Sequence, residues 1–384
     1  MWYLLSKRLG IIGGGQLGMM LTEASKNMEN ISNVTVLDPT ENCPAAQAGA
    51  NQIVGNFRDK NSILKLSKES DVITYEIESG DSEVLKSIEG AVEINPSPDT
   101  LKIIQDKYLQ KMFLKENEIP VAQFSIINSK SDFETKINDF GLPVLLKTRR
   151  DAYDGRGNYK ITNSSEINNA FDYFDDKKTY LEKFVDFKME VSVIAARSTN
   201  GEITTYPVVE NIHEQNILRT TIAPARIEQD IQKNAERIAV KTMEVLKGAG
   251  VFGIEMFVTK TDEILINEIA PRVHNSGHHT LNSSVTSQFE QHLRAIMGMS
   301  LGSTKLVRPT VMYNILGSKN FTGEYKPIKF TQDNVFLKMY GKKTSKPLRK
   351  LGHVNIVAQD SETVEDLIKK LDYMKNEFEI LPKN

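Results

Sequence analysis

The first hundred residues alternate short apolar runs with amphipathic segments, and this alternation limits the fold more than any other feature of the chain. Short apolar strands that alternate with helical segments are typical of a parallel sheet with helices on both faces. The sequence therefore predicts an α/β fold that begins with a doubly wound sheet. The expected strands are Leu9–Ile12, Val34–Leu37, Val72–Tyr75 and Val92–Ile94.

Two further units are expected after this region. The proline-rich segment Asn95–Pro98 punctuates the chain, and Asp99 can cap one long helix that runs to about Asn117. The later elements expected are strands at Pro143–Lys147 and Tyr180–Phe184, and helices near Gln229–Lys247 and Ser284–Met297. A chain of 384 residues is long enough for three domains, which we place at residues 1–98, 99–187 and 188–384.

Composition excludes several classes of partner. The 48 basic and 50 acidic residues leave a formal charge of −2, so no strong overall field attracts nucleic acid or anionic lipid. Cys43 is the single cysteine, which rules out an intrachain disulfide and a cysteine metal cluster. The chain has no run of about 18 apolar residues and no signal-peptide pattern at its start. We therefore expect no membrane partner, no nucleic-acid partner and a cytoplasmic location.

The segment from Gly13 to Gly18 follows the first strand and has the spacing G-x-G-x-x-G. Asp38 ends the next strand, where a dinucleotide fold places the acid that binds ribose. Glycines let the backbone approach an anion, and a helix N-terminus offers free N–H donors. The pattern leaves three interpretations open: a dinucleotide pyrophosphate, a substrate monophosphate, or a tight turn with no ligand.

Two lysines and a glycine-containing loop indicate a second anion site in the middle of the chain. Lys107 lies on the helix after the proline-rich segment, and Lys147 ends an apolar strand. The loop that follows can fold over phosphates and exclude water, although it lacks the G-K-[ST] ending of a Walker A sequence. It consists of Ala152, Tyr153, Asp154, Gly155, Arg156, Gly157 and Asn158.

A further segment has the character of a connection between domains. Glu190 lies shortly after the end of a strand, where its carboxylate could accept hydrogen bonds from ribose hydroxyls. Backbone groups of such a connection could read the edge of an adenine, and a purely structural linker is the alternative interpretation. The residues concerned are Glu182, Lys183, Phe184 and Val185.

Two glutamates are predicted to face each other on a β-hairpin. Symmetric pairing about Thr261 and Asp262 places Glu255 opposite Glu268. Cross-strand neighbours lie about 5 Å apart at Cβ, and like charges at that distance destabilise a sheet unless a cation lies between them. Oxygen ligands completed by phosphate oxygens are what Mg²⁺ prefers, so the pair predicts a metal site. The alternatives are a register shifted by one residue, or two solvated glutamates.

The segment from Ala270 to His278 follows this pair directly. Arg272 offers a fork of donors for a carboxylate or bicarbonate oxygen, and His274 and Asn275 add short polar groups. The spacing of His274 and His278 allows zinc ligation in principle, but no third ligand is evident.

In this order, the segments resemble the ATP-grasp superfamily, and within it most closely the family of N5-carboxyaminoimidazole ribonucleotide (N5-CAIR) synthases. The resemblance covers nearly the whole chain, and Ala270–His278 is its most discriminating part. It implies an N-terminal Rossmann-like preATP-grasp domain, a lid domain and a C-terminal α+β domain. The other motifs that carry it are Ile11–Gly18, Asp38-Pro39, Thr74–Glu76, Gln105–Lys107, Tyr153–Gly157, Glu182–Val185 and Arg349–His353.

The resemblance implies how ATP would be held between the lid and the C-terminal domain. Lys107 and Lys147 would contact the phosphates, residues 152–158 would cover them, and residues 182–185 would read the adenine. The remaining implied contacts are Glu190 to the ribose, His213 and Asn267 near the nucleotide, and Glu255 and Glu268 to Mg²⁺, or to Mn²⁺ in its place.

Three positions depart from the family pattern. Lys107 stands where many relatives have arginine, Ala152 where glycine is frequent, and Asn158 where glutamine is frequent. None of the three removes a charge, so we expect an active enzyme in which nucleotide affinity is the property most open to change.

The resemblance also implies a site for 5-aminoimidazole ribonucleotide (AIR). It would place Lys342 and Arg349 at the AIR phosphate, and the glycine loop would then serve AIR rather than NAD. The other residues implied at AIR are Gly15, Gln16, Leu17 and Glu76, with Tyr153 and Arg156 from the loop.

The implied reaction has two steps. Bicarbonate attacks the γ-phosphorus of ATP to give carboxyphosphate and ADP, and the CO₂ released from carboxyphosphate is then captured by the amine of AIR. Lys147 would stabilise the transferring phosphoryl group, and Asp154 would position or deprotonate the amine. The candidates for holding bicarbonate are Arg272, His274 and Asn275.

The resemblance further implies a homodimer that passes its labile product to a separate N5-CAIR mutase. Three other functions are weighed against this one. A formate-dependent glycinamide ribonucleotide transformylase is disfavoured by the run His274–His278. An NAD-dependent oxidoreductase leaves the lysines, the loop and the paired glutamates without a role. A nucleotide-binding module without catalysis is disfavoured because every charged role is filled.

Overall fold

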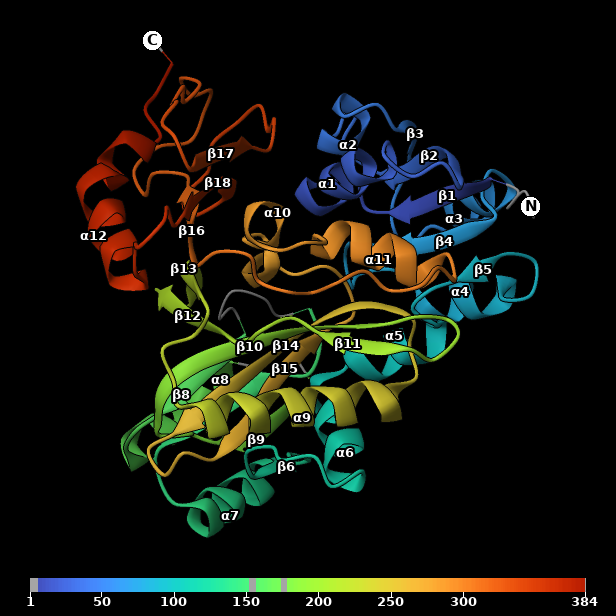
Figure 1. Ribbon diagram of the computed structural model, residues 1–384. Coiled ribbons are helices and arrows are strands. Elements are labelled where there is room, and N and C mark those ends of the chain that lie inside the picture. Colours follow the sequence, from blue (N-terminus) through green and yellow to red (C-terminus); the bar gives the residue numbers. More distant parts are fainter. Residues whose placement is uncertain (1–5, 152–156, 174–177, 384) are drawn as a thin grey trace.

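The computed structural model describes residues 6–151, 157–173 and 178–383. The chain forms three separate β-sheets, each covered by helices (Figure 1). Within these described ranges, no helix is both long enough and apolar enough to cross a membrane.

The first sheet is parallel, with strand order β3-β2-β1-β4-β5, which confirms the predicted doubly wound unit. Its third strand was not predicted, because only Ile53 of that strand is buried and an exposed edge strand has no apolar run. The strands are β1 (Lys7–Ile12), β2 (Ile31–Asp38), β3 (Asn51–Val54), β4 (Val72–Tyr75) and β5 (Glu93–Ile94), and the helices are α1 (Gln16–Ser25), α2 (Pro44–Gln47), α3 (Lys60–Lys68) and α4 (Ser82–Ile88).

The single long helix predicted after this sheet is wrong. The chain instead forms α5 (Pro98–Gln105) and α6 (Lys107–Glu116), with Asp106 in an extended conformation between them. The Asp106 carboxylate accepts hydrogen bonds from two backbone N–H groups of the first turn of α6, so it caps a new helix rather than continuing the old one. The cap of α5 is Ser97 and not Asp99.

The second sheet is antiparallel and has the order β6-β9-β7-β8. The predicted strands that carry Lys147 and Glu182 lie next to each other in it. Its strands are β6 (Phe124–Ile126), β7 (Val144–Thr148), β8 (Asn158–Ile161) and β9 (Thr179–Lys183), with α7 (Lys130–Phe140), the 3₁₀ turn η1 (Ser164–Glu166) and α8 (Ile167–Tyr173).

The third sheet contains nine strands in the order β15-β14-β10-β12-β13-β16-β18-β17, with β11 paired to β10. Its strands are β10 (Phe187–Arg197), β11 (Ile203–Thr205), β12 (Val209–Glu214), β13 (Ile217–Ala223), β14 (Gly250–Thr259), β15 (Ile264–Ala270), β16 (Thr310–Leu316), β17 (Val335–Met339) and β18 (Lys350–Val357). The helices are α9 (Gln229–Leu246), α10 (Thr280–Ser283), α11 (Gln288–Ile296) and α12 (Val364–Met374), with the 3₁₀ turns η2 (Asn275–Gly277) and η3 (Lys375–Phe378).

Helix α11 joins the first sheet to the third, as Figure 1 shows between α1 and β14. His292 of this helix accepts a hydrogen bond at Nδ1 from Val251 N–H, so its other ring nitrogen carries the proton and donates to Thr74 Oγ1. Leu293 packs in the same apolar core as Leu17. This packing brings the glycine loop to the strands that carry Glu255 and Glu268.

Candidate active site

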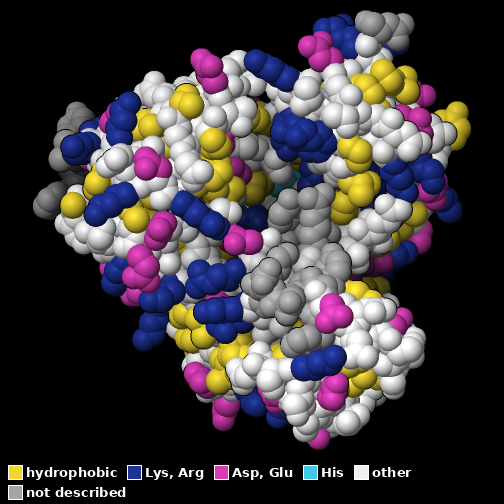
Figure 2. Space-filling view, turned by 180° about the vertical axis from the view of Figure 1, so that it is seen from behind, with side chains coloured by type: hydrophobic (Ala, Val, Ile, Leu, Met, Phe, Trp, Pro, Cys, Tyr) yellow, Lys and Arg dark blue, Asp and Glu magenta, His cyan; other side chains and the backbone are white. Residues whose placement is uncertain are grey.

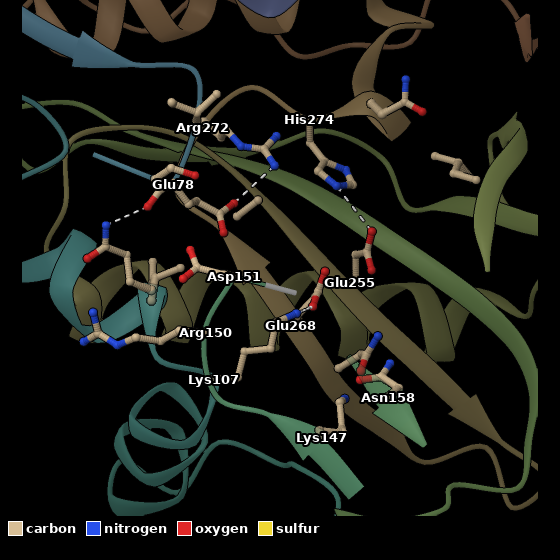
Figure 3. A pocket seen from close by; sticks show the side chains of 18 of the residues that line it. Glu78, Lys107, Lys147, Arg150, Asp151, Asn158, Glu255, Glu268, Arg272 and His274 are labelled. Carbon is tan, nitrogen blue, oxygen red and sulfur yellow. Dashed lines mark hydrogen bonds and ion pairs between the residues drawn. The ribbon is translucent and has the colours of Figure 1, made fainter. Parts of the chain in front are cut away.

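A cleft of about 1210 Å³ is lined by strand residues of the second and third sheets and by helix and loop residues next to the first sheet. Lysine and arginine side chains gather around a hollow on the face shown in Figure 2, and Figure 3 shows side chains that line the cleft. The structure brings these predicted residues together on its walls: Gln16, Leu17, Glu76, Lys107, Lys147, Asn158, Phe184, Glu190, His213, Glu255, Asn267, Glu268, Arg272, His274 and Asn275. The predicted residues in the described part of the chain that do not line it are Gly15, Gly157, Glu182, Lys183, Val185, Lys342 and Arg349.

Glu255 and Glu268 are paired across β14 and β15, as predicted. The assumed turn was nevertheless misplaced, because Val258 pairs with Ile264, which centres the turn on Thr261 alone. A β-bulge next to Glu255 shifts the register by one residue and restores the opposition of the two glutamates. Without that bulge, the residue opposite Glu255 would be Asn267.

Both carboxylates have nitrogen partners within the cleft, a lysine for Glu268 and a histidine for Glu255 (Figure 3). Lys107 Nζ pairs with Glu268 Oε2, and His274 Nε2 lies 3.3 Å from Glu255 Oε1. Burial by itself would raise the pKa of Glu255, but the hydrogen bond and charge of His274 lower it to about 2. Both glutamates are thus held in a positively charged setting that suits ionised oxygen ligands.

These two glutamates fit a magnesium ion that takes its remaining ligands from elsewhere. In residues 6–151, 157–173 and 178–383, no group of three or more histidine, cysteine or acidic side chains is placed to hold a metal. Mg²⁺ is commonly bound by one or two carboxylates together with substrate phosphates and water. The donor set present here therefore suits a metal that arrives with a nucleotide better than a permanent metal centre.

Lys147 reaches the cleft from β7, and its ammonium lies 3.1 Å from Glu182 Oε1. Glu182 is 1% exposed, and its other oxygen lies 3.0 Å from Lys111 Nζ. Burial tends to raise the pKa of Glu182, but the two ammonium groups lower it to about 2. The Glu182 carboxylate is therefore engaged inside the protein, and only its backbone is left for a ligand.

The end of β9 is held by hydrogen bonds to residues of the second unit. Lys183 N–H donates to Gln123 O at 2.8 Å, and its side chain donates to Gly141 O. Phe184 lines the cleft together with Phe187 and Phe257, whose rings stack 4.6 Å apart. The flat apolar surface that suits an adenine is therefore made partly by residues that the sequence analysis missed. The one available signal was their aromatic character on two neighbouring strands.

Glu190 and His213 form an ion pair from neighbouring strands, β10 and β12. Burial lowers the pKa of His213, but the hydrogen bond and charge of Glu190 outweigh it and raise the pKa above its usual value. Both side chains line the cleft near Phe187. A ribose hydroxyl placed here would meet a carboxylate whose position is set by the histidine.

Two backbone N–H groups of the glycine loop donate hydrogen bonds to carboxylates of the protein itself. Gly14 N–H donates to Asp38 Oδ2 at 2.9 Å, and Gly15 N–H donates to Glu76 Oε1 at 2.7 Å. Gly13 has φ +101°, and a Cβ there would lie 2.5 Å from Glu76 Cγ. The glycines are thus needed for the approach of Glu76. A pyrophosphate would meet two acidic side chains, which argues against the dinucleotide interpretation.

Burial raises the pKa of Glu76 to about 7, because the Gly15 N–H and the charge of Arg272 only partly offset the loss of solvent. Folded protein therefore binds more protons at this site than unfolded protein between about pH 4.5 and 7. The stabilisation is complete below the unfolded pKa and is lost as the pH rises through 7. We expect Glu76→Gln, which cannot ionise, to lack this dependence.

The measurement is urea unfolding of the wild type and Glu76→Gln at pH values from 4.5 to 8. The free energy of unfolding of the wild type should fall relative to the variant by on the order of 3 kcal/mol over this range. Glu83→Gln, on an exposed side chain, serves as the control. A difference between wild type and Glu76→Gln that stays constant with pH would contradict the raised pKa.

Lys342 contacts the start of α1, directly after the glycine loop, and Arg349 bonds to Thr344. Lys342 Nζ donates to Gln16 Oε1 at 2.7 Å and to Lys350 O at 2.7 Å. Burial, followed by the charge of Arg349, lowers the pKa of Lys342 to about 8. The structure therefore links this basic segment to the start of α1, which the sequence could not show.

Arg272 and the residues after it form one wall of the cleft. Arg272 Nη2 lies 3.2 Å from Glu78 Oε1 (Figure 3), and its buried Nε has no hydrogen-bond partner among the described residues. Asn275 Nδ2 donates to Asn314 Oδ1 at 3.1 Å. His278 is fully buried and bonded to Gln288, so it belongs to the core rather than to a zinc site with His274.

Five residues of the predicted lid lie outside the described part of the chain, namely Ala152, Tyr153, Asp154, Gly155 and Arg156. After them, Gly157 O accepts a hydrogen bond from Thr148 N–H, and Asn158 pairs with Lys147 across β7 and β8. The cleft also includes residues that the sequence analysis did not single out as site residues, namely Arg58, Glu78, Arg150, Asp151 and Lys350.

Comparison with known proteins identifies the class first. Three protein-family models match: the ribonucleotide synthetase preATP-grasp domain at residues 6–105, the ATP-grasp domain at 112–289, and the phosphoribosylaminoimidazole carboxylase C-terminal domain at 310–367. The fold and the cleft are therefore those of an ATP-grasp ligase.

Individual relatives identify the family within the ATP-grasp ligases. The N5-CAIR synthase of Bacillus subtilis is 39% identical over 94% of this chain and 94% of its own length. The crystal structure of N5-CAIR synthetase from Thermotoga maritima is 44% identical, with a TM-score of 0.87 over 98% of this chain and 100% of that one. The Aspergillus clavatus enzyme, solved with ADP and AIR, is 32% identical with a TM-score of 0.88 over 98% of this chain and 99% of that one. The chain belongs to the N5-CAIR synthase family.

Proposed function

We propose that this protein carboxylates AIR with bicarbonate and ATP, giving N5-CAIR, ADP and phosphate, a reaction of purine biosynthesis. The observation that carries the proposal is the pairing of Glu255 with Glu268 beside Lys107 and Lys147 in one cleft. The Aspergillus clavatus relative, solved with ADP and AIR, supports the choice of substrates.

The chemistry begins with attack of a bicarbonate oxygen on the γ-phosphorus of ATP, which breaks the bond to ADP and forms carboxyphosphate. Lys147 and Lys107 provide positive charge for the phosphate oxygens. When Mg²⁺ is bound by Glu255 and Glu268, it supplies further positive charge to the transferring phosphoryl group. Arg272 and His274 hold bicarbonate at the wall of the cleft, with Asn275 beside them.

In the second step, carboxyphosphate releases CO₂ and phosphate, and the exocyclic nitrogen of AIR attacks CO₂ and loses a proton. Glu76, directly after β4, and Gln16, at the start of α1, orient AIR, while Lys342, which lies outside the cleft lining but bonds to Gln16, holds its phosphate together with Arg349. Carboxyphosphate hydrolyses readily, so the closed cleft has to exclude water. Residues 152–158 are proposed to cover the cleft, and Asp154 to position the amine.

The test of the function is the release of ADP from ATP in the presence of Mg²⁺ and bicarbonate, with and without AIR. We expect turnover that AIR stimulates and that consumes one AIR for each ADP formed. ATP hydrolysis that ignores AIR, or the absence of any ATP turnover, would contradict the proposal. Glycinamide ribonucleotide with formate serves as the control pair of substrates and should not stimulate ADP release.

The lowered pKa of Lys342 leads to a pH-dependent use of AIR. We expect kcat/KM for AIR to fall about tenfold between pH 7 and pH 9, because a neutral amine loses its attraction for the phosphate. Lys342→Arg keeps its charge and should remove this dependence. Steady-state rates at pH 7, 8 and 9 provide the measurement, with kcat/KM for ATP as the control. A wild type with a flat profile for AIR would rule out this role for Lys342.

We further propose that the protein is a cytoplasmic homodimer and that a separate mutase consumes its carbamate product. Family membership supports these statements. We also propose domains at residues 1–98, 99–187 and 188–384, supported by the three sheets, which follow these ranges except that β10 of the third sheet begins at Phe187.

A further inference from the structure

Lys111 is a lysine buried beneath the cleft. It lies one turn after Lys107 on α6, so both side chains leave the same face of the helix. Its side chain is 2% exposed, and its ammonium donates to Ile266 O at 3.0 Å and lies 3.0 Å from Glu182 Oε2. A buried ammonium is costly unless oxygen atoms compensate it, so the charge of Lys111 depends on these two partners.

The Glu182 carboxylate is shared between two lysines. One oxygen lies 3.1 Å from Lys147 Nζ and the other 3.0 Å from Lys111 Nζ. With both lysines protonated, the three side chains together carry one net positive charge, and a single carboxylate cannot neutralise both ammonium groups. Of the two lysines, Lys147 lines the cleft, so the remaining positive charge faces the space in which a nucleotide would lie.

Lys111 also connects the two walls of the cleft. Glu182 belongs to β9 of the second sheet, and Ile266 belongs to β15 of the third sheet, two residues before Glu268. Lys107, from the same helix, reaches Glu268 itself. Helix α6 therefore contacts both sheets through two lysines, and only one of these lysines lines the cleft.

We propose that Lys111 is a positioning residue of the nucleotide site, which shares the Glu182 carboxylate with Lys147 and so keeps the Lys147 ammonium available to nucleotide phosphates. This inference rests on the proposed function in that the cleft binds ATP. Without Lys111, Glu182 and Lys147 form a neutral pair. A neutral pair offers no net positive charge to the nucleotide phosphates.

The test compares the affinity for ADP by titration calorimetry in the wild type, Lys111→Met and the double variant Lys111→Met/Glu182→Gln. The single variant should bind ADP about tenfold more weakly, since it loses one net positive charge beside the phosphates. The double variant restores that net charge and leaves Lys147 without a carboxylate, so its affinity should return to within about threefold of the wild type. Lys115→Met, on an exposed position of the same helix, should leave ADP binding unchanged.

Two results, one from Lys111→Met and one from the double variant, would overturn the proposal. Unchanged ADP affinity in Lys111→Met would overturn the proposal. A double variant as weak as the single one would also overturn it, because a purely structural tie to Ile266 O predicts no recovery. If Lys111→Met does not fold, the double variant alone tests the proposal. An ADP affinity within about threefold of the wild type supports the proposal, and any greater loss of affinity contradicts it. A wild type that does not bind ADP would instead overturn the proposed function.

Discussion

Glu268→Gln is expected to lower AIR-dependent ADP formation roughly a hundredfold to a thousandfold, while the protein remains folded. The change keeps the size of the side chain but removes the charge that pairs with Lys107 and faces Glu255. A neutral amide is a poor ligand for Mg²⁺, and Lys107 is then no longer held by an opposite charge. The side chain is 39% exposed, so we expect little loss of stability.

The matched control for this prediction is Glu263→Gln, on the exposed turn of the same hairpin. Both variants are compared with the wild type by ADP release at saturating ATP, AIR and bicarbonate, over a range of Mg²⁺ concentrations. Glu263→Gln should turn over normally at every concentration. Turnover of Glu268→Gln within about twofold of the wild type would show that the hairpin carboxylates are not the metal site.

Arg272→Lys is expected to lower kcat/KM for bicarbonate by about a hundredfold. Lysine keeps the positive charge but loses the planar fork, and with it the buried Nε donor that has no partner among the described residues. The contact with Glu78 at 3.2 Å would also lose its fixed geometry. Because Arg272 is assigned to bicarbonate, KM for ATP should change by less than about threefold.

Arg226→Lys is the control, because Arg226 likewise pairs with a glutamate, Glu210, in its case through two hydrogen bonds, and does not line the cleft. Initial rates at varied bicarbonate and fixed ATP measure the effect. If Arg272→Lys changed KM for ATP and left kcat/KM for bicarbonate alone, Arg272 would belong to the nucleotide site instead.

The pairing of Glu255 with Glu268 could be predicted from the sequence, but the backbone geometry that produces it could not. Their opposition was predicted from a symmetric hairpin, and the structure confirms it, but through a β-bulge that the symmetric hairpin did not include. A bulge is decided by packing on both faces of the sheet and has no reliable sequence pattern. The same limit applies to Asp106, whose capping of α6 is stabilised by a two-point pair with Arg149, more than forty residues away.

The glycine loop shows the opposite case, in which a clear pattern was ambiguous by itself. The spacing was compatible with a pyrophosphate, a monophosphate or a plain turn, because all three need the same backbone conformation. Glu76 directly follows β4, and the distance of 2.7 Å from its carboxylate to Gly15 N exists only once β1 and β4 are paired. That contact, with the one from Gly14 N–H to Asp38, occupies two donors that a dinucleotide would need.

The sequence by itself determined the α/β class, most strands of the first sheet, the hairpin that carries Glu255 and Glu268, and the residue types of the cleft, because periodicity and local motifs are read along the chain. Only the tertiary structure decided which charged side chains can face a ligand and which are engaged by other residues of the protein. It places Glu182 between Lys111 and Lys147, buries His278, and holds Lys342 against Gln16. These contacts join residues far apart in the chain, and the charge state of each group depends on the burial and partners that folding supplies.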